Sequence, residues 1–370
     1  MNTSASCELL ERLISIESVN PTLVPGGAGE AELARFVASW LEDAGLEVDL
    51  HELAPSRANV IARVRGSGSG RSLILNGHLD TVGLAGNADG VTPRVEDGRL
   101  YGRGAYDMKG SLAAIMLAAA EASRSSLSGD VIVTAVADEE DGSIGTEAVV
   151  ERVRADGAIV TEPTDLRLAL SHRGFVWLEL EARGLAAHGS RYDLGVDAIT
   201  KLSEALAGVR DLDARFARAM PHPVLGRASV HASLIEGGHE LSTYPDRCVL
   251  KVERRTLPGE TVQQVEDELR AVAGEASVRS FFSREPLETS PDEAIVATFQ
   301  RHAEAVLGRA PEVIGVPFWT DAALLAAAGI PTVVFGPRGE GAHADLEWVE
   351  LADVERLAEI LLATATEFCA

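Results

Sequence analysis

One stretch of the chain restricts its possible folds more than any other: an apolar, β-branched run at 131–137 that ends in four consecutive acidic residues. These residues are Asp138, Glu139, Glu140 and Asp141. A continuous apolar run is typical of a strand buried on both faces, and parallel sheets of such strands bind ligands beyond the carboxyl ends. Four carboxylates packed there would repel one another unless a cation lay among them. Taken alone, the stretch is more simply explained as a solvated acidic turn. A metal site is favoured only if metal-binding residues also lie at the ends of other strands.

The composition is that of a globular protein with two domains. At 370 residues and 46% hydrophobic content, the chain exceeds the size of one ordinary core. The formal net charge of −24 disfavours nucleic acid and anionic membranes as partners. Cys7, Cys248 and Cys369 are few and far apart, which fits a reducing compartment. The N-terminal residues do not resemble a signal peptide, and no apolar run reaches the roughly 18 residues of a membrane span. We therefore expect a cytoplasmic protein.

The order of the predicted helices and strands indicates an α/β domain with a second domain inserted into it. Residues 1–173 alternate helices with buried strands, and the same pattern resumes over 284–370. Between them, residues 174–283 follow the order β-α-β-β-α-β, which is the ferredoxin-like arrangement. The predicted helices lie at 6–17, 30–44, 110–125, 145–155, 195–211, 260–273, 291–307, 320–328 and 350–367. We expect an α/β fold with an open, mostly parallel sheet, into which the ferredoxin-like α+β domain is inserted.

Side chains that bind divalent metals follow several of the predicted strands or precede a helix. They are His78 and Asp80, Asp107, Glu139 and Glu140, Glu162 and His343. Two imidazoles and several carboxylates, without cysteine, suit Zn²⁺ or a similar divalent ion. The number of carboxylates exceeds what one tetrahedral ion requires. The set therefore suggests two metals that share a ligand and lie about 3.5–4 Å apart.

Each of these residues also has a purely structural interpretation. A single histidine on a strand is usually a hydrogen-bonded core residue. The spacing of His78 and Asp80 favours a ligand, because residues i and i+2 point the same way and Asp80 can hold the other imidazole nitrogen. Asp107 fits equally the N-cap of the following helix, and Glu162 fits a surface turn before Pro163. The coincidence of all of them at strand ends favours the metal site.

Five short motifs resemble those of the M20 family of dinuclear zinc aminoacylases and carboxypeptidases. They are GHLDTV at 77–82, GRGAYDMKG at 102–110, ADEE at 137–140, TEPT at 161–164 and AH at 342–343. The family includes acetylornithine deacetylase, succinyl-diaminopimelate desuccinylase, aminoacylase-1 and glutamate carboxypeptidase. The resemblance spans nearly the whole chain, and it implies a catalytic domain (1–173 and 284–370) with an inserted lid (174–283) through which the protein forms a homodimer.

The resemblance also implies a role for each candidate residue. It places His78, Asp107 and Glu162 around one metal, and Asp107, Glu140 and His343 around the other. Glu139 matches the general base, and Asp80 matches the carboxylate that supports the ligands. Consecutive residues that leave a strand point in different directions, which agrees with separate roles for Glu139 and Glu140. Asp138 and Asp141 are then interpreted as ordinary solvated residues.

Two residues of the inserted domain match substrate-binding residues of the family. His188 resembles the histidine that reaches toward the reacting carbonyl, in the family from the partner subunit, and it could equally be an ordinary histidine at a strand end. Arg255 resembles the arginine that holds the substrate carboxylate, for which bidentate pairing suits arginine. A solvated strand face is the alternative for Arg255 and for its neighbour Arg254. Ser242 departs from the family pattern, which commonly has Asn at that place, so its substrate contact stays open.

The sequence thus predicts a metal-dependent hydrolase that cleaves the amide bond of N-acyl amino acids, as acetylornithine deacetylase does. Two divalent ions, zinc or alternatively cobalt, would supply a hydroxide, and Glu139 would carry its proton to the leaving amine. A dipeptidase or carboxypeptidase of the same family is the alternative, and a non-catalytic protein that binds amino acids or peptides is a further one. The acyl group, the amino-acid side chain, the native metal and the oligomeric state stay open.

Overall fold

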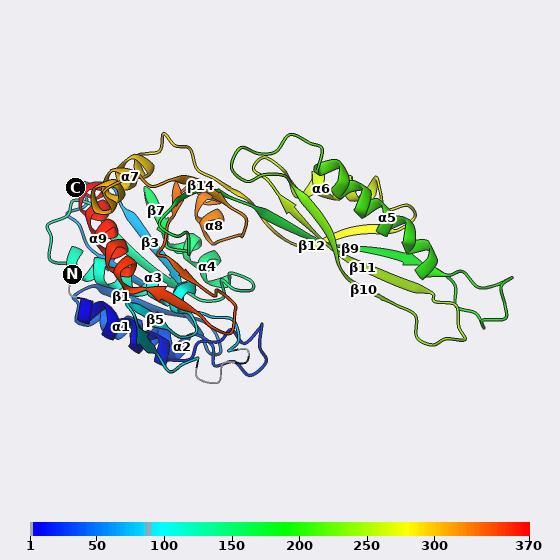
Figure 1. The fold of residues 1–370 in the computed structure, drawn as a ribbon, viewed down its shortest axis with the longest axis horizontal. Coiled ribbons are helices and arrows are strands. Elements are labelled where there is room, and N and C mark those ends of the chain that lie inside the picture. The colour runs from blue at the N-terminus through cyan, green and yellow to red at the C-terminus, as the bar shows by residue number, and fades with distance from the viewer. Residues whose placement is uncertain (1–2, 85, 87–89) are drawn as a thin grey trace. The chain divides into compact units, whose positions relative to one another are not determined.

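The computed structural model describes residues 3–84, 86 and 90–370. The chain forms two compact units, shown as a ribbon in Figure 1. The first unit contains residues 1–170, 289–314 and 320–370, and the second contains 171–288 and 315–319. The sequence placed the inserted domain at 174–283. Here the second unit is a few residues longer at each end, because β13 (Leu287–Glu288) pairs with the end of β8 (Leu168–His172).

The first unit is built on the large mixed sheet, which has nine strands. Its order begins β1 (Glu47–Ala54), β2 (Arg57–Val64), β6 (Val131–Val136), β3 (Leu73–His78), β7 (Gly157–Val160) and β15 (Thr332–Val334), and β8 and β13 follow, with β14 (Val313–Val316) also beside β8. Strands β6, β3, β7 and β15 are parallel, whereas β1, β2 and β8 join the sheet antiparallel. Every residue of β3 and β6 is buried, as the continuous apolar runs predicted. The α/β fold class is confirmed, with parallel pairing confined to the centre of the sheet.

Helices pack around this sheet (Figure 1). They are α1 (Thr3–Ser15), α2 (Ala31–Asp43), α3 (Gly110–Ala122), α4 (Ile144–Arg152), α7 (Ala294–Leu307), α8 (Ala322–Ala327) and α9 (Leu351–Phe368). Almost all of α3 is buried, and its alanines allow α9 to pack closely against it. Helix α4 is shorter than predicted, because the chain becomes extended at Val153. Among the described residues, no helix combines the length and the apolar character needed to cross a membrane.

A small sheet links the C-terminal part of the first unit to the segment that precedes α3. It has the order β16 (Gly339–Glu340), β17 (Trp348–Glu350), β5 (Arg99–Tyr101) and β4 (Arg94–Glu96), and all its pairs are antiparallel. Strands β4 and β5 form a hairpin that turns at Asp97 and Gly98, with φ of 50° and 78°. The irregular turn η1 (Ala105–Lys109) follows β5 and leads into α3. The loop that contains His343 therefore lies beside the segment that contains Asp107.

The second unit has the predicted ferredoxin-like order. Its elements are β9 (Gly174–Arg183), α5 (Ala198–Phe216), β10 (Ser229–Gly237), β11 (Arg247–Thr256), α6 (Val262–Arg270) and β12 (Ser277–Arg284). The sheet order is β10-β11-β9-β12, and every pair is antiparallel. Alternate residues of β9 and β11 pack with α5 and α6 in a core separate from that of the first unit. Both helices begin at capped residues, Asp197 and Thr261, which fixes their starts.

Candidate metal centre

The carboxyl ends of three neighbouring parallel strands bring together most of the predicted ligands. His78 is the last residue of β3 and pairs with Val136 at the end of β6. Glu139 and Glu140 follow β6, and Glu162 follows β7, which pairs with the other edge of β3. Because the three strands are parallel, these side chains emerge at one edge of the sheet. The structure therefore brings these predicted ligands together.

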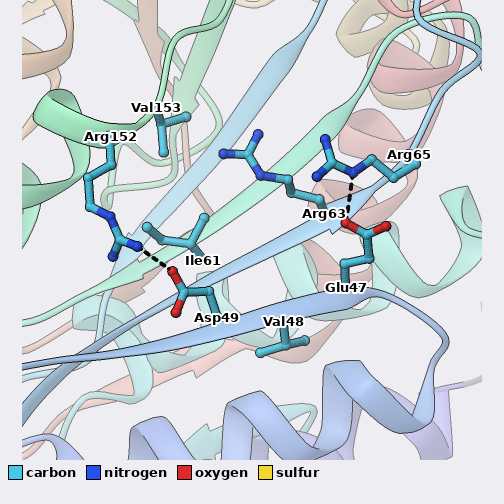
Figure 2. A pocket seen from close by; sticks show the side chains of 8 residues that line it. All are labelled: Glu47, Val48, Asp49, Ile61, Arg63, Arg65, Arg152 and Val153. Atoms are coloured by element: carbon cyan, nitrogen blue, oxygen red, sulfur yellow. Dashed lines mark hydrogen bonds and ion pairs between the residues drawn. The ribbon is translucent and has the colours of Figure 1, made fainter.

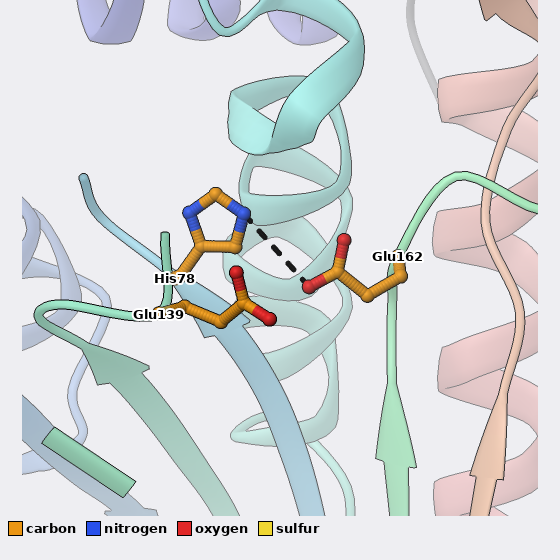
Figure 3. Close-up of side chains that lie close together, drawn as sticks. All are labelled: His78, Glu139 and Glu162. Carbon is orange, nitrogen blue, oxygen red and sulfur yellow. Dashed lines mark ion pairs between the residues drawn. The ribbon is translucent and has the colours of Figure 1, made fainter. Parts of the chain in front are cut away.

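The imidazole of His78 is buried, and it is oriented by main-chain contact. Its Nδ1 lies 2.9 Å from the main-chain carbonyl oxygen of Asp80, whereas the Asp80 carboxylate is 3.6 Å away. A carbonyl oxygen only accepts hydrogen bonds, so Nδ1 carries a proton, and Nε2 is the nitrogen that can bind a metal once it is deprotonated. Nε2 lies 3.1 Å from Asp107 Oδ1 and 3.8 Å from Glu162 Oε1, as Figure 3 shows for Glu162.

Asp107 lies between the two predicted metal positions. Its Oδ1 faces His78, and its Oδ2 lies 3.5 Å from Nε2 of His343. The same His343 nitrogen is 2.9 Å from Glu140 Oε2. An aspartate whose two oxygens face two different histidines has the geometry of a shared ligand. Asp107 lies in the non-helical part of η1, so it is not the N-cap of α3.

Two overlapping groups of atoms in the described part of the chain are close enough to hold a metal. One consists of His78, Glu139 and Glu162 (Figure 3), and the other of His78, Asp107 and Glu140, with the ligand atoms of each group within 4.8 Å of one another. Glu139 therefore lies as close to the centre as the predicted ligands do. Its assignment as base and not as ligand stays a prediction.

The buried acids of the centre lack enough positive charge of their own. Burial raises the pKa of Glu139, and the carboxylate of Glu162 raises it further. Burial and the charge of Asp107 likewise raise the pKa of Glu140, whose Oε1 is buried without a hydrogen-bond partner. Burial opposes protonation of His78, but Glu162 and Asp107 outweigh it and raise its pKa well above the usual value. An unpartnered oxygen beside clustered carboxylates and imidazoles fits divalent cations.

The histidine at the open side of the centre responds to the same carboxylates. Hydrogen bonds with Asp107 and Glu140 raise the pKa of His343 to about 10. Burial alone would raise the pKa of Asp107, but the hydrogen bonds from His343 and His78 hold it below its usual range. The two histidines and Asp107 thus form one electrostatic unit, as expected of a shared carboxylate.

The carboxylate of Asp80 supports the Glu139–Glu140 segment. Its Oδ1 accepts the backbone N–H of Glu139 and its Oδ2 that of Glu140, both at 3.1 Å. Asn20 Nδ2 donates to the same Oδ2 at 2.8 Å. The sequence analysis did not identify Asn20, because its loop has no periodic pattern. The contact between Asp80 and the predicted base is therefore more direct than its contact with the His78 ring.

The interpretation of Asp138 as a solvated residue is wrong. Asp138 is buried, and its Oδ1 accepts hydrogen bonds from Arg57 at 2.5 Å and from Asn20 at 3.0 Å. Arg57 also pairs with buried Glu30 at 3.1 Å. This network packs under the acidic turn and neutralises part of its charge, which no local pattern in the sequence indicates. Asp141, by contrast, is exposed as predicted.

The predicted substrate-binding residues of the inserted domain lie in the second unit. His188 is exposed, and its Nδ1 lies 2.9 Å from Ser190 Oγ. Ser242 is also exposed, and its main-chain oxygen accepts the N–H of Gly189. The two arginines of β11 differ sharply. Arg254 is fully buried and paired with Glu260 and Glu268, whereas Arg255 is partly exposed and lies beside Glu253.

Two hollows of the first unit differ in character. The one in Figure 2 has a volume of about 220 Å³ and is lined by none of the predicted ligands. Its lining includes two ion pairs, one between Arg152 of α4 and Asp49 of β1, and one between Arg65, directly after β2, and Glu47 of β1. The other, of about 640 Å³, has mainly apolar walls that include Val19, Val24 and Val82, and His343 lines it as well. Only the second hollow adjoins the candidate centre.

Comparison with known proteins agrees with this geometry. A sequence profile described as Peptidase family M20/M25/M40 matches residues 74–367. An acetylornithine deacetylase of Myxococcus xanthus is 32% identical, covering 95% of this chain and 93% of that protein. An N-formyl-4-amino-5-aminomethyl-2-methylpyrimidine deformylase of Halalkalibacterium halodurans is 30% identical, covering 98% of this chain and 95% of its own.

A solved structure has the same fold over nearly its full length. It is an M20 family metallo-carboxypeptidase from Sulfolobus solfataricus, with a TM-score of 0.80 at 19% identity, covering 100% of this chain and 99% of that one. The profile match covers more than half of the chain, and the relatives match it almost from end to end. The chain therefore belongs to Peptidase family M20/M25/M40 and is a metal-dependent hydrolase.

Proposed function

We propose that this hydrolase removes the acyl group from N-acyl amino acids. The observation that carries the proposal is the position of Asp107, whose two oxygens face His78 and His343 while Glu139 lies beside His78 and Glu162. We propose that His78, Asp107 and Glu162 hold one divalent ion and that Asp107, Glu140 and His343 hold a second. Imidazole and carboxylate donors favour zinc, with cobalt as the alternative. Such ions polarise a carbonyl group and make water acidic near neutral pH.

Glu139 is the proposed proton carrier. One of its carboxylate oxygens takes a proton from the attacking water while the water oxygen bonds to the amide carbon. The same proton then passes to the amide nitrogen as the carbon–nitrogen bond breaks, which leaves a carboxylic acid and an amine. The remaining proton of the acid passes to the amine or to solvent and gives the carboxylate. Asp80 fixes the backbone from which Glu139 projects.

The substrate would be recognised through its free carboxylate. We propose that Arg255 pairs with it and that His188, from the partner subunit, donates toward the carbonyl oxygen of the amide. Arg255 is partly exposed and pairs with one glutamate, Glu253, whereas its buried neighbour Arg254 is occupied by two glutamates. The apolar hollow beside His343 would accept an aliphatic part of the substrate.

A deacylase is supported over a peptidase by the names of the relatives at 30% identity or above, a deacetylase and a deformylase. The carboxypeptidase at 19% identity shares the fold. The test is a panel of N-acetyl amino acids and dipeptides, assayed with zinc before and after chelation. We expect chelator-sensitive turnover of the acetyl amino acids with higher kcat/KM. A preference for dipeptides would instead assign a peptidase, and turnover that chelators leave unchanged would contradict the metal mechanism.

We further propose that two copies associate through the second unit. Strand β10 is an edge of its sheet, and its Leu234 and Ile235 are 65% and 55% exposed. Ile199 on α5 adds to the exposed apolar surface of the unit. A second copy that paired with this edge would satisfy its free backbone groups and cover its apolar side chains.

A cytoplasmic location accords with the three free cysteines.

A further inference from the structure

The carboxylate of Glu347 accepts hydrogen bonds from the backbone of the turn that contains Asp107. Glu347 lies in the loop between β16 and β17, four residues after His343, and it is 2% exposed. Its Oε1 accepts the backbone N–H groups of Tyr106 at 2.9 Å and of Asp107 itself at 3.0 Å. Its Oε2 accepts the N–H of Gly104 at 2.9 Å. One buried side chain therefore satisfies three donors of the same turn.

Arg103 connects Glu347 to the turn of His343. Its Nη1 donates to Glu347 Oε2 at 2.7 Å, and its Nη2 donates at 2.7 Å to the main-chain oxygen of Ala344, the residue after His343. Its Nε donates to the main-chain oxygen of Gly83 at 3.0 Å. Arg103 is 5% exposed, so these bonds form away from bulk solvent. The pair thus joins the segments of both Asp107 and His343.

The local backbone explains why the turn needs an added acceptor. Asp107 and Met108 have φ/ψ of −120°/91° and −135°/35°, so the third and fourth residues of η1 depart from helical geometry. Gly104, at φ 77°, lets the chain reverse where a Cβ would approach Thr81 Cγ2 to 2.8 Å. A carboxylate can accept all four of the hydrogen bonds that Glu347 receives. A glutamine in its place would turn an NH₂ group toward backbone donors.

The two proposed metal positions depend on this arrangement to different degrees. His78 and Glu162 follow the buried strands β3 and β7, which hold them independently of the turn. His343 has a φ of 63° in an exposed loop, where Ala344 N–H donates to Gly341 O and Arg103 holds the Ala344 oxygen. Asp107 takes part in both positions, whereas His343 takes part in one. Loosening the turn of Asp107 and the loop of His343 should therefore weaken metal binding more at the position that includes His343 than at the position formed by His78, Asp107 and Glu162.

We propose that Glu347, together with Arg103, is a positioning residue that sets the backbone of Asp107 and the turn of His343, and so assembles the metal position formed by Asp107, Glu140 and His343. This inference rests on the proposed two-metal function. It assigns to Glu347 no contact with substrate or with the reacting atoms. Partners that orient metal ligands typically change metal affinity or activity by about 10–100-fold when they are replaced.

The test compares Glu347→Gln with Glu340→Gln, a matched change of an exposed glutamate on β16. Metal-free samples are first examined by amide hydrogen exchange over 103–108. Zinc is then titrated in competition with a chromophoric chelator. We expect faster exchange in Glu347→Gln, the ion of the Asp107–Glu140–His343 position weakened roughly 10–100-fold, and the other ion weakened less. Glu340→Gln should match the unsubstituted protein in both measurements.

Unchanged exchange in Glu347→Gln, two ions bound with unchanged affinity, or equal weakening of both ions would overturn the inference. Arg103→Lys provides a second variant that decides the matter if Glu347→Gln does not fold. It keeps a cation beside Glu347 but loses the contact with Ala344, so it should weaken the same single ion. If the unsubstituted protein itself takes up fewer than two ions, the proposed function fails, whereas the exchange comparison still tests the effect of Glu347 on the turn.

Discussion

The backbone N–H of Glu139 donates to Asp80 Oδ1 at 3.1 Å. The carboxylate predicted to support a histidine thus also fixes the residue predicted to move the proton. Asp80 is fully buried, and Glu140 N–H and Asn20 Nδ2 donate to its other oxygen. All of these partners donate hydrogen bonds, so position 80 requires a side chain that only accepts hydrogen bonds.

Asp80→Asn should therefore lower kcat by roughly 10–100-fold while KM changes little. The amide would face at least one of the donors with its own NH₂ group, which shifts the backbone of Glu139. Steady-state kinetics on an N-acetyl amino acid would measure the effect. Asp141→Asn, at an exposed acid of the same turn, is the control and should leave kcat unchanged. Wild-type kcat in Asp80→Asn would rule out this role.

The adjacent arginines of β11 should respond in opposite ways to truncation. Arg255→Ala should raise KM roughly tenfold to a hundredfold, because a charged hydrogen bond to the substrate carboxylate is lost, and should leave the melting temperature nearly unchanged. Arg254→Ala should destabilise the second unit by about 1–3 kcal/mol, because Glu260 and Glu268, which are 28% and 32% exposed, lose a buried partner. Kinetics and thermal unfolding of both variants would test the contrast. An unaltered KM in Arg255→Ala would remove Arg255 from the substrate site.

Glu30 should make the stability of the metal-free protein depend on pH. Burial and the charge of Asp80 raise its pKa from 4.5 to about 7, against the opposing effect of Arg57. Between these values the folded state keeps a proton that the unfolded state has released. The free energy of unfolding should therefore fall as pH rises from 4.5 to 7, by about 3 kcal/mol from this group.

The glutamine of Glu30→Gln cannot ionise, so this variant should lack the part of the pH dependence of the free energy of unfolding that comes from Glu30. Urea unfolding of both proteins at pH 5 and pH 8, with chelator present, would measure the difference. The stability lost between the two pH values should be smaller in Glu30→Gln than in the unsubstituted protein. An equal or greater loss in the variant would show that Glu30 does not titrate in this window.

Association of two copies should depend on β10. The double substitution Leu234→Glu and Ile235→Glu should weaken dimerisation at least tenfold, because it would introduce charges into the apolar edge. Phe281→Glu, on the opposite edge strand β12 and 43% exposed, is the matched control. Sedimentation velocity over a range of concentrations would follow the equilibrium. A monomeric unsubstituted protein at tens of micromolar, or a dimer that survives the β10 change, would contradict the proposed interface.

The sequence predicts the residues that follow strands well, because burial and parallel pairing leave a local signal. The apolar start of β3 at 73–75 and the β-branched run of β6 are enough to place His78 and the Glu139–Glu140 pair at one edge of a sheet. The alternating burial along β11 also explains why Arg254 is buried and Arg255 is partly exposed. Leu250, Val252 and Arg254 all face the core, and Arg255 faces the other way. That alternation is present in the sequence, but by itself it does not show which arginine would bind a substrate.

The supporting residues could not be predicted in the same way. Glu347 acts on a turn about 240 residues earlier in the chain, and only the pairing of β17 with β5 brings the two segments together. Arg57 reaches Asp138 across the sheet, which turns an apparently solvated acid into a buried one. Such contacts depend on how loops close over the strand ends. Neither periodicity nor the residue types of a loop encode that closure.

The metal content and turnover of Glu139→Gln distinguish a proton carrier from a metal ligand at position 139. If Glu139 is the proton carrier and the other carboxylates hold the ions, the variant should bind two metals per chain as tightly as the unsubstituted protein. Its kcat should fall roughly 10²–10⁴-fold, because the amide cannot take the proton from water. Elemental analysis of the reconstituted variant, together with steady-state kinetics, provides both numbers. A variant that loses a metal, or one that keeps its kcat, would contradict the account.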